Sequence, residues 1–136
     1  MILTAENISK KFNQLTAVND ISLSVEKGCF YSLLGPNGAG KTTTINLLCT
    51  LLKSDSGNIF MDGINSSLDP LKIKSLIGVV PQEISLYDDF TAEENLMFWG
   101  KMYHVSSASL KTRIEKCLHD FGLTDRKKDK LKTYSG

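Results

Sequence analysis

The chain has 136 residues, which is enough for about one domain. Hydrophobic residues make up 41% and charged residues 23%, so the composition is that of a globular protein rather than a disordered one. Sixteen Lys and Arg residues nearly balance 15 Asp and Glu residues, which argues against a nucleic-acid partner attracted by overall positive charge. No segment has the ~18 consecutive apolar residues of a membrane span, and the first residues lack the pattern of a secretory signal peptide.

Three cysteines, Cys29, Cys49 and Cys117, lie at positions without metal-ligand spacing. Each lies in an apolar pattern, so we expect reduced, buried thiols. Reduced thiols are typical of a cytosolic protein.

The first third of the chain has the patterns of β-strands. Ile2 to Ile8 predicts one strand, and a second is predicted around residues 21–25, where apolar and polar residues alternate. Residues 26–28 predict a turn. The nearly continuous apolar run from Cys29 to Leu34 predicts a strand buried on both faces, as in a parallel sheet.

A glycine-rich loop at residues 35–40 precedes a predicted helix over residues 41–53. Apolar residues at helical spacing predict the buried face of this helix: Ile45, Leu48, Cys49 and Leu52.

Two further strands and a short helix are predicted before residue 81. Asn58 to Met61 predicts a short strand, and Ile77 to Val80 predicts another buried strand. Between them, Asp69 and Pro70 predict the N-cap and first residue of a helix that runs to Ser75.

The remainder of the chain is predicted to be helical. Thr91 and Glu94 have the spacing of a capping box, for a helix that runs to about Tyr103. A second helix is predicted to end before Gly122. Its apolar face is expected to carry Leu110, Ile114, Cys117, Leu118 and Phe121.

Residues 35–42, Gly-Pro-Asn-Gly-Ala-Gly-Lys-Thr, match the phosphate-binding pattern G-x-x-x-x-G-K-[ST] completely. Glycines let backbone N–H groups converge on an anion, and the helix that follows directs its positive dipole end to the same point. Lys41 is predicted to reach the β- and γ-phosphates of a nucleoside triphosphate. The Thr42 hydroxyl is predicted to bind Mg²⁺, and Thr43 adds a second hydroxyl near the phosphates.

A catalytic carboxylate is harder to find. Asp62 follows an apolar run and could end a Walker-B-type strand, but the following Gly63 favours a hairpin turn. The strand predicted at residues 77–80 ends in Pro81 and Gln82 instead of a carboxylate. The sequence therefore predicts no convincing Walker B within these residues.

With these motifs in place, the sequence resembles the ATP-binding subunits of ABC transporters, in order across essentially all 136 residues. Residues 35–44 are close to the commonest form of the loop in that family. Residues 57–63 and 88–96 are similar to the branch that serves ABC-2-type and drug-resistance exporters. The resemblance implies an α/β P-loop NTPase core of ABC type with an N-terminal antiparallel β part and the start of a helical subdomain.

The resemblance also assigns site residues. Phe12 occupies the place of the aromatic residue that stacks on adenine, and core packing is the alternative role for this ring. Gln82 matches the Q-loop glutamine, which contacts Mg²⁺ and the attacking water. The implied nucleotide contacts are Phe12, Val18, Gly35, Asn37, Gly38, Ala39, Gly40, Lys41, Thr42 and Thr43.

Residues 134–136, Tyr-Ser-Gly, match the first three positions of the family signature, with Tyr in place of Leu. In the family, this Ser and Gly bind the γ-phosphate held by the opposite subunit, which assigns that role to Ser135 and Gly136. The family's signature helix, Walker B and switch histidine would follow. We therefore expect the chain to be the N-terminal piece of a larger subunit, with an ATP-binding part over 1–86 and a helical part over 87–136.

The implied function is an ABC-type ATPase that couples ATP and Mg²⁺ to transport. Its partners would be a second ATP-binding subunit and a membrane permease, at the cytoplasmic face of the membrane and without nucleic acid. The 136 residues alone are expected to lack turnover. Two alternatives stay open: an ABC ATPase that serves ribosomes or DNA repair, and a non-catalytic nucleotide-binding fragment. A small GTPase is disfavoured because the chain has no Asn-Lys-x-Asp sequence.

Overall fold

Residues 1–81 and 86–134 are described in a computed structural model, which divides into two units. We call residues 1–80 the sheet unit and residues 81–136 the helical unit, and treat each by itself. The functional boundary expected between residues 86 and 87 stays a prediction.

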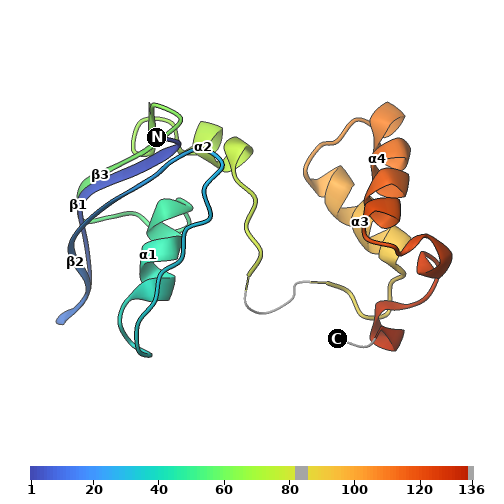
Figure 1. The fold of residues 1–136 in the computed structure, drawn as a ribbon, viewed down its shortest axis with the longest axis horizontal. Coiled ribbons are helices and arrows are strands. Elements are labelled where there is room, and N and C mark those ends of the chain that lie inside the picture. The colour runs from blue at the N-terminus through green and yellow to red at the C-terminus, as the bar shows by residue number, and fades with distance from the viewer. Residues whose placement is uncertain (82–85, 135–136) are drawn as a thin grey trace. The chain divides into compact units, whose positions relative to one another are not determined.

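The sheet unit contains four antiparallel strands in the order β2-β1-β3-β4 (Figure 1). They are β1 (Leu3–Phe12), β2 (Leu15–Val25), β3 (Ser56–Met61) and β4 (Ile64–Asn65). The first two predicted strands are therefore confirmed, and both are longer than expected. Ala5, Ile8, Val18 and Ile59 lie in one buried cluster. Ala5 and Ile8 share it because the pairing of β1 with β2 shifts in register between them, where Asn7 has a φ of 51°.

The turn between β3 and β4 contains Asp62 and Gly63. Their φ angles are 49° and 77°, so both residues have the positive φ that a two-residue type I′ hairpin turn requires. The prediction that Asp62 is a turn residue is confirmed.

Helix α1 (Lys41–Leu48) packs its buried side against this sheet. Leu47 is fully buried and Leu48 and Leu52 pack beside it, whereas Ile45 is 46% exposed. The predicted face was therefore wrong at Ile45, and the helix ends earlier than expected. On the buried side of α1, Thr44 is buried where the sequence pattern favoured Ile45. A polar residue can be buried there because the Thr44 hydroxyl donates a hydrogen bond to Gly40 O at 2.9 Å.

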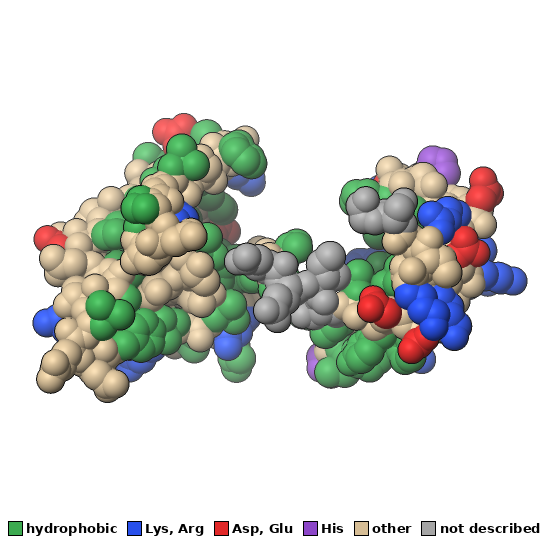
Figure 2. Space-filling model, turned by 90° about the horizontal axis from the view of Figure 1, so that it is seen from below, with side chains coloured by type: hydrophobic (Ala, Val, Ile, Leu, Met, Phe, Trp, Pro, Cys, Tyr) green, Lys and Arg blue, Asp and Glu red, His purple; other side chains and the backbone are tan. Residues whose placement is uncertain are grey.

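The strands predicted at 29–34 and 77–80 are absent, and these predictions were wrong. Phe30, Leu34 and Val80 are 97%, 90% and 94% exposed. A strand buried on both faces needs neighbouring strands and covering layers, and among the described residues no strand pairs with either segment. Exposed hydrophobic side chains accordingly appear on the surface of the sheet unit (Figure 2). The Cys29 thiol is exposed for the same reason, while Cys49 and Cys117 are half-buried, so the prediction of buried thiols was wrong for Cys29.

The short helix α2 (Pro70–Leu76) begins as predicted. The Asp69 side chain accepts a hydrogen bond from Lys72 N at 3.0 Å, and Pro70 occupies the first helical position. Ile73 is fully buried within the sheet unit.

The helical unit consists of α3 (Ala92–Met102) and α4 (Ser107–Asp120), followed by two short 3₁₀ turns, η1 (Thr124–Arg126) and η2 (Leu131–Thr133). The capping box is confirmed: Glu94 N donates to Thr91 Oγ1 at 3.1 Å and Thr91 N donates to Glu94 Oε2 at 2.8 Å. No described helix combines the length and hydropathy that a membrane span needs. The core of the unit is formed by Ala92, Leu110, Ile114 and Leu118.

The end of α4 is partly as predicted. Gly122 has φ 66° just after the helix, as a C′ glycine should. Phe121 is 76% exposed, so its assignment to the buried face was wrong. Phe121 is the C-cap residue, beyond the last regular turn, and helical spacing no longer predicts its direction there.

Candidate functional site: a phosphate-binding loop

The glycine-rich loop turns directly into α1. Gly38 and Gly40 have φ angles of 85° and 81°, in the left-handed region that residues with a Cβ rarely adopt. Gly40 is the N-cap of α1. The sequence needs glycine at both positions because the chain must reverse before the first helical turn.

The N-terminus of α1 is free to bind an anion. No side chain caps it, and its first turn contains no acidic residue. The N–H groups of Lys41, Thr42 and Thr43 have no acceptor within the helix, because the first turn lacks the preceding carbonyls. Backbone donors and the positive helix dipole therefore converge where the sequence predicts phosphate.

The Lys41 ammonium group reaches back across the loop. Its Nζ donates to Gly35 O at 2.8 Å and to Pro36 O at 2.7 Å. A phosphate at the loop would offer charged oxygens as stronger acceptors than these neutral carbonyls. The ammonium group therefore lies on the loop that precedes α1, and its contact with the β- and γ-phosphates stays a prediction.

The position of the loop is fixed by β2. A Cβ at Gly40 would collide with the backbone oxygen of Ala17 and would lie 3.6 Å from Val18 Cγ2. Val18 is 2% exposed and belongs to the sheet core. Its predicted contact with the nucleotide stays a prediction, and its observed contribution is to support the loop.

Phe12 is the last residue of β1 and is 46% exposed, so its ring has free surface for stacking. Lys10 Nζ lies 5.8 Å from the centroid of this ring. The ammonium group is held by Asp55, whose Oδ1 accepts from Lys10 Nζ at 2.6 Å and whose Oδ2 accepts from Lys11 N at 2.7 Å. Adenine stacking on Phe12 stays a prediction.

The contacts of Asp55 could not be predicted from the sequence, because this residue lies far from β1 along the chain. Its carboxylate joins the end of β1 to the segment that leads into β3. The hydrogen bond from the Lys10 side chain is the main reason why the pKa of Asp55 lies below its ordinary value, and the hydrogen bond from the Lys11 backbone lowers this pKa further. The carboxylate is therefore ionised at neutral pH and keeps Lys10 beside Phe12.

The chemistry of the loop fits a magnesium ion. Mg²⁺ prefers oxygen ligands and is usually bound through a few protein oxygens together with phosphate and water. The exposed Thr42 supplies a hydroxyl in the first turn of α1. The second predicted ligand, Gln82, lies outside the described residues.

The predicted signature residues, Ser135 and Gly136, also lie outside the described residues. Their neighbour Tyr134 is well anchored: its hydroxyl donates to Arg126 O at 2.7 Å, and its ring centroid lies 4.1 Å from Arg126 Cζ. The Arg126 guanidinium group also donates to Thr133 O at 3.1 Å. Tyr134, at the predicted first position of the signature, is thus held by a cation–π contact and a hydrogen bond.

Comparison with known proteins agrees with this geometry. The family model described as ABC transporter matches residues 18–136. The linearmycin resistance ATP-binding protein LnrL of Bacillus subtilis (strain 168) is 50% identical over 135 residues, covering 99% of this chain and 43% of that protein. The daunorubicin/doxorubicin resistance ATP-binding protein DrrA of Streptomyces peucetius is 37% identical, covering 98% of this chain and 41% of that protein.

A solved structure is also similar. It is a dimeric, post-hydrolysis state of an ATP-binding cassette bound to ADP and Pi, with a TM-score of 0.76 and 26% identity, covering 98% of this chain and 63% of that one. The chain spans less than half the length of the two curated relatives. These matches confirm the predicted resemblance and the fold class, an incomplete α/β P-loop NTPase fold of ABC type.

Proposed function

Because this chain belongs to the ABC transporter family, we propose that it forms part of an ATP-binding subunit of a drug-resistance-type exporter. The subunit couples MgATP binding and hydrolysis to transport through a membrane permease. The observation that carries the proposal is the loop at residues 35–40, with Lys41 beside an uncapped helix N-terminus.

Each predicted residue has a distinct task in binding. The N–H groups of the first turn of α1 donate hydrogen bonds to the phosphate oxygens, and the positive end of the helix dipole attracts their negative charge. Lys41 exchanges its bonds to Gly35 O and Pro36 O for phosphate oxygens, and its charge offsets the charge that develops as water attacks the γ-phosphate. Phe12 holds the base through its exposed ring.

Thr42 and Gln82 are the residues that would hold Mg²⁺, which would offset the negative charge of the phosphates. Gln82 would also orient the attacking water. Ser135 and Gly136 would contact the γ-phosphate bound by a second subunit, so the working unit is a dimer. The names of the relatives, which are resistance ATP-binding proteins, support a role in resistance, and the dimeric solved structure supports a dimer. We place this dimer at the cytoplasmic face of the membrane, where it would meet the permease.

The first test is nucleotide binding by the Lys41→Ala variant. Loss of a charged hydrogen-bond donor should weaken MgATP binding by about ten- to a hundredfold. Lys53→Ala is the matched control, because Lys53 is an exposed lysine of the same unit that follows α1. Isothermal titration that gives equal affinities for wild type and Lys41→Ala would contradict the proposed role of the loop.

We also propose that residues 1–136 by themselves bind nucleotide without turnover. The one candidate carboxylate that follows an apolar strand, Asp62, is a residue of the β3–β4 turn. Ground-state binding without a positioned catalytic group does not accelerate hydrolysis. Phosphate release by these residues that disappears in Lys41→Ala would overturn this part of the proposal.

A further inference from the structure

The exposed ring of Phe12 has a charged neighbour on its own strand. Lys10 and Phe12 are two residues apart in β1, so alternation along the strand places both side chains on one face of the sheet. The distance of 5.8 Å from Lys10 Nζ to the ring centroid is within the range of a cation–π contact. The Lys10 side chain is only 15% exposed. The ammonium group is therefore largely covered, while part of the ring stays free for a base.

Asp55 holds the ammonium group in this place. Its carboxylate accepts hydrogen bonds from Lys10 Nζ and Lys11 N, and its own N–H donates to Ser9 O at 2.9 Å. Bonds to three consecutive residues of β1 leave the carboxylate little freedom to move. The next residue, Ser56, begins β3 and pairs with Ser9. The direction of the Lys10 side chain is thus set where β1 and β3 pair.

The other neighbour of β1 connects Lys10 with the phosphate-binding loop. The register of β1 and β2 pairs Lys10 with Val18 and then skips Ala17, which makes Ala17 the extra residue of a β-bulge. The backbone oxygen of Ala17 is the atom that lies against Gly40, the N-cap of α1. The strand that carries Phe12 is therefore paired with the strand on which the loop rests.

We propose that Lys10, held by Asp55, is a positioning residue that fixes the Phe12 ring for stacking on the base of a nucleotide. The inference rests on the proposed function and deepens it. The cation attracts the ring electrostatically, and a ring already held in place loses less conformational freedom when a base stacks on it. Because this contribution acts through the face of the ring, it should be the same for adenine and guanine.

A purely structural role for the ion pair predicts a different result. A clip between β1 and β3 would affect the whole sheet unit, and with it the loop at residues 35–40. Inorganic tripolyphosphate separates the two roles, because it offers phosphates to the loop and has no base for Phe12. A structural clip should therefore change the affinity for both MgATP and magnesium tripolyphosphate, whereas a positioning residue should change only the affinity for MgATP.

Isothermal titration of the purified chain with MgATP, MgGTP and magnesium tripolyphosphate tests the proposal. Lys10→Met removes the charge and keeps the side-chain stem. It should weaken binding of both nucleotides by about two- to fivefold and leave tripolyphosphate binding unchanged. Asp55→Asn should have the same effect to a smaller extent, because the amide still accepts one hydrogen bond. Lys10→Arg should restore most of the affinity, because guanidinium keeps the charge and pairs with carboxylate.

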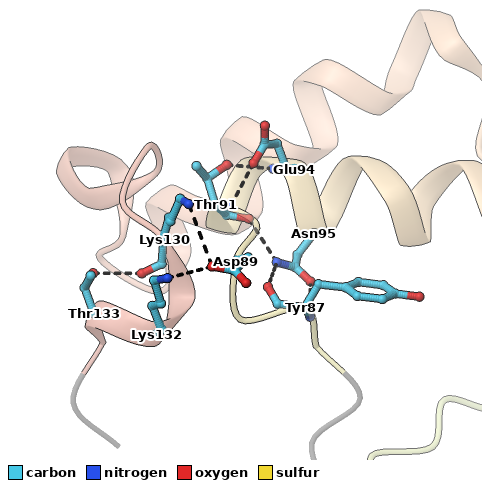
Figure 3. A network of polar contacts seen from close by, with 8 residues as sticks. All are labelled: Tyr87, Asp89, Thr91, Glu94, Asn95, Lys130, Lys132 and Thr133. Atoms are coloured by element: carbon cyan, nitrogen blue, oxygen red, sulfur yellow. Dashed lines mark hydrogen bonds and ion pairs between the residues drawn. The ribbon is translucent and has the colours of Figure 1, made fainter.

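The dependence on Phe12 makes the test specific. Phe12→Ala should weaken binding of both nucleotides by about five- to a hundredfold. Lys10→Met should add nothing in that background, because the ring through which Lys10 acts is gone. Asp89→Asn is the matched control, since Asp89 accepts from Lys132 Nζ, also at 2.6 Å, in the helical unit (Figure 3). This control removes an ion pair of the same kind and should change none of the three affinities.

The possible failures point to different conclusions. Lys10→Met that weakens all three ligands equally, that weakens none, or that adds a loss to Phe12→Ala would overturn the positioning role. A wild-type chain that binds MgATP no better than tripolyphosphate would also overturn it, and would leave phosphate binding by the loop intact. A wild-type chain that binds none of the three ligands would defeat the proposed function, and this inference with it.

Discussion

The sheet unit and the helical unit respond differently to the same kind of sequence pattern. In the helical unit, apolar residues at helical spacing are buried, as Ile114 and Leu118 are at 4% and 3% exposure. In the sheet unit, the nearly continuous apolar run at residues 29–34 contains Phe30 and Leu34, which are almost fully exposed.

The difference lies in where the burying partner is found. Helices α3 and α4 are consecutive and cover each other's apolar faces through local contacts. A strand with two apolar faces depends on neighbours that are distant in sequence. An apolar pattern therefore predicts that a segment can be buried. Among the described residues, the segment is buried only where another helix or strand packs against it.

The largest expected effect tests this contrast with one substitution in each unit. Leu118→Ala should lower the free energy of unfolding by about 2–5 kcal/mol, because it leaves a cavity in the core of the helical unit. Leu34→Ala should change it by less than about 0.5 kcal/mol, because Leu34 is exposed. Urea unfolding followed by circular dichroism compares them, and equal losses would show that residue 34 is buried in solution.

A second pair of substitutions tests whether a close backbone contact excludes a side chain at one position of the sheet unit. Gly57 has φ 82°, and a Cβ there would collide with the backbone of Glu6 and Asn7. Gly57→Ala should therefore cost about 3 kcal/mol of unfolding free energy, the sum of collision and strain. Gly28→Ala is the control, since Gly28 also has φ 82° but has open space around it, and it should cost only about 1 kcal/mol. Similar losses of unfolding free energy for the two variants would mean that the backbone of β1 moves to make room for a Cβ at residue 57.

A smaller effect distinguishes two helix starts in the helical unit. Thr91→Ala should cost about 1 kcal/mol, because it removes the hydrogen bond to Glu94 N at the start of α3. Ser106→Ala should cost clearly less, because Ser106 is the N-cap of α4 without a side-chain cap bond. The fluorescence of Trp99, the single tryptophan and a residue of α3, follows the unfolding. A reversed order would contradict the capping geometry.

The smallest effect is electrostatic and belongs to the sheet unit. Because the pKa of Asp55 is lowered in the folded state, its contribution to stability is present above its unfolded pKa of about 3.9 and is lost as pH falls through the folded value. Unfolding free energy should therefore decline below about pH 4. Asp55→Asn should flatten that decline, and a profile identical to wild type would show that Lys10 and Lys11 do not hold the carboxylate.

Local chemistry was well predicted from the sequence. The cap at Asp69, the capping box at Thr91 and the turn at Asp62 each depend on residues within four positions of one another. The phosphate-binding loop belongs to the same class, since residues 35–42 contain both its glycines and the start of its helix.

Features made by distant residues were not predictable. Asp55 meets Lys10 and Lys11 only after β1 and β3 have paired, and nothing in the local sequence marks it. Asn95 reads as an ordinary polar residue of an amphipathic helix until Tyr87 folds back onto it. Thr44 was missed because a polar residue was assumed to face solvent, whereas its hydroxyl is satisfied within the helix.

The seating of Gly40 on β2 has a genetic consequence. The atom that excludes a side chain at position 40 is the backbone oxygen of Ala17, which every amino acid at position 17 would carry. A defect caused by Gly40→Ala therefore has no compensating substitution at its point of contact. Revertants selected against such a defect should restore glycine, because no exchange of side chain at residue 17 can make room.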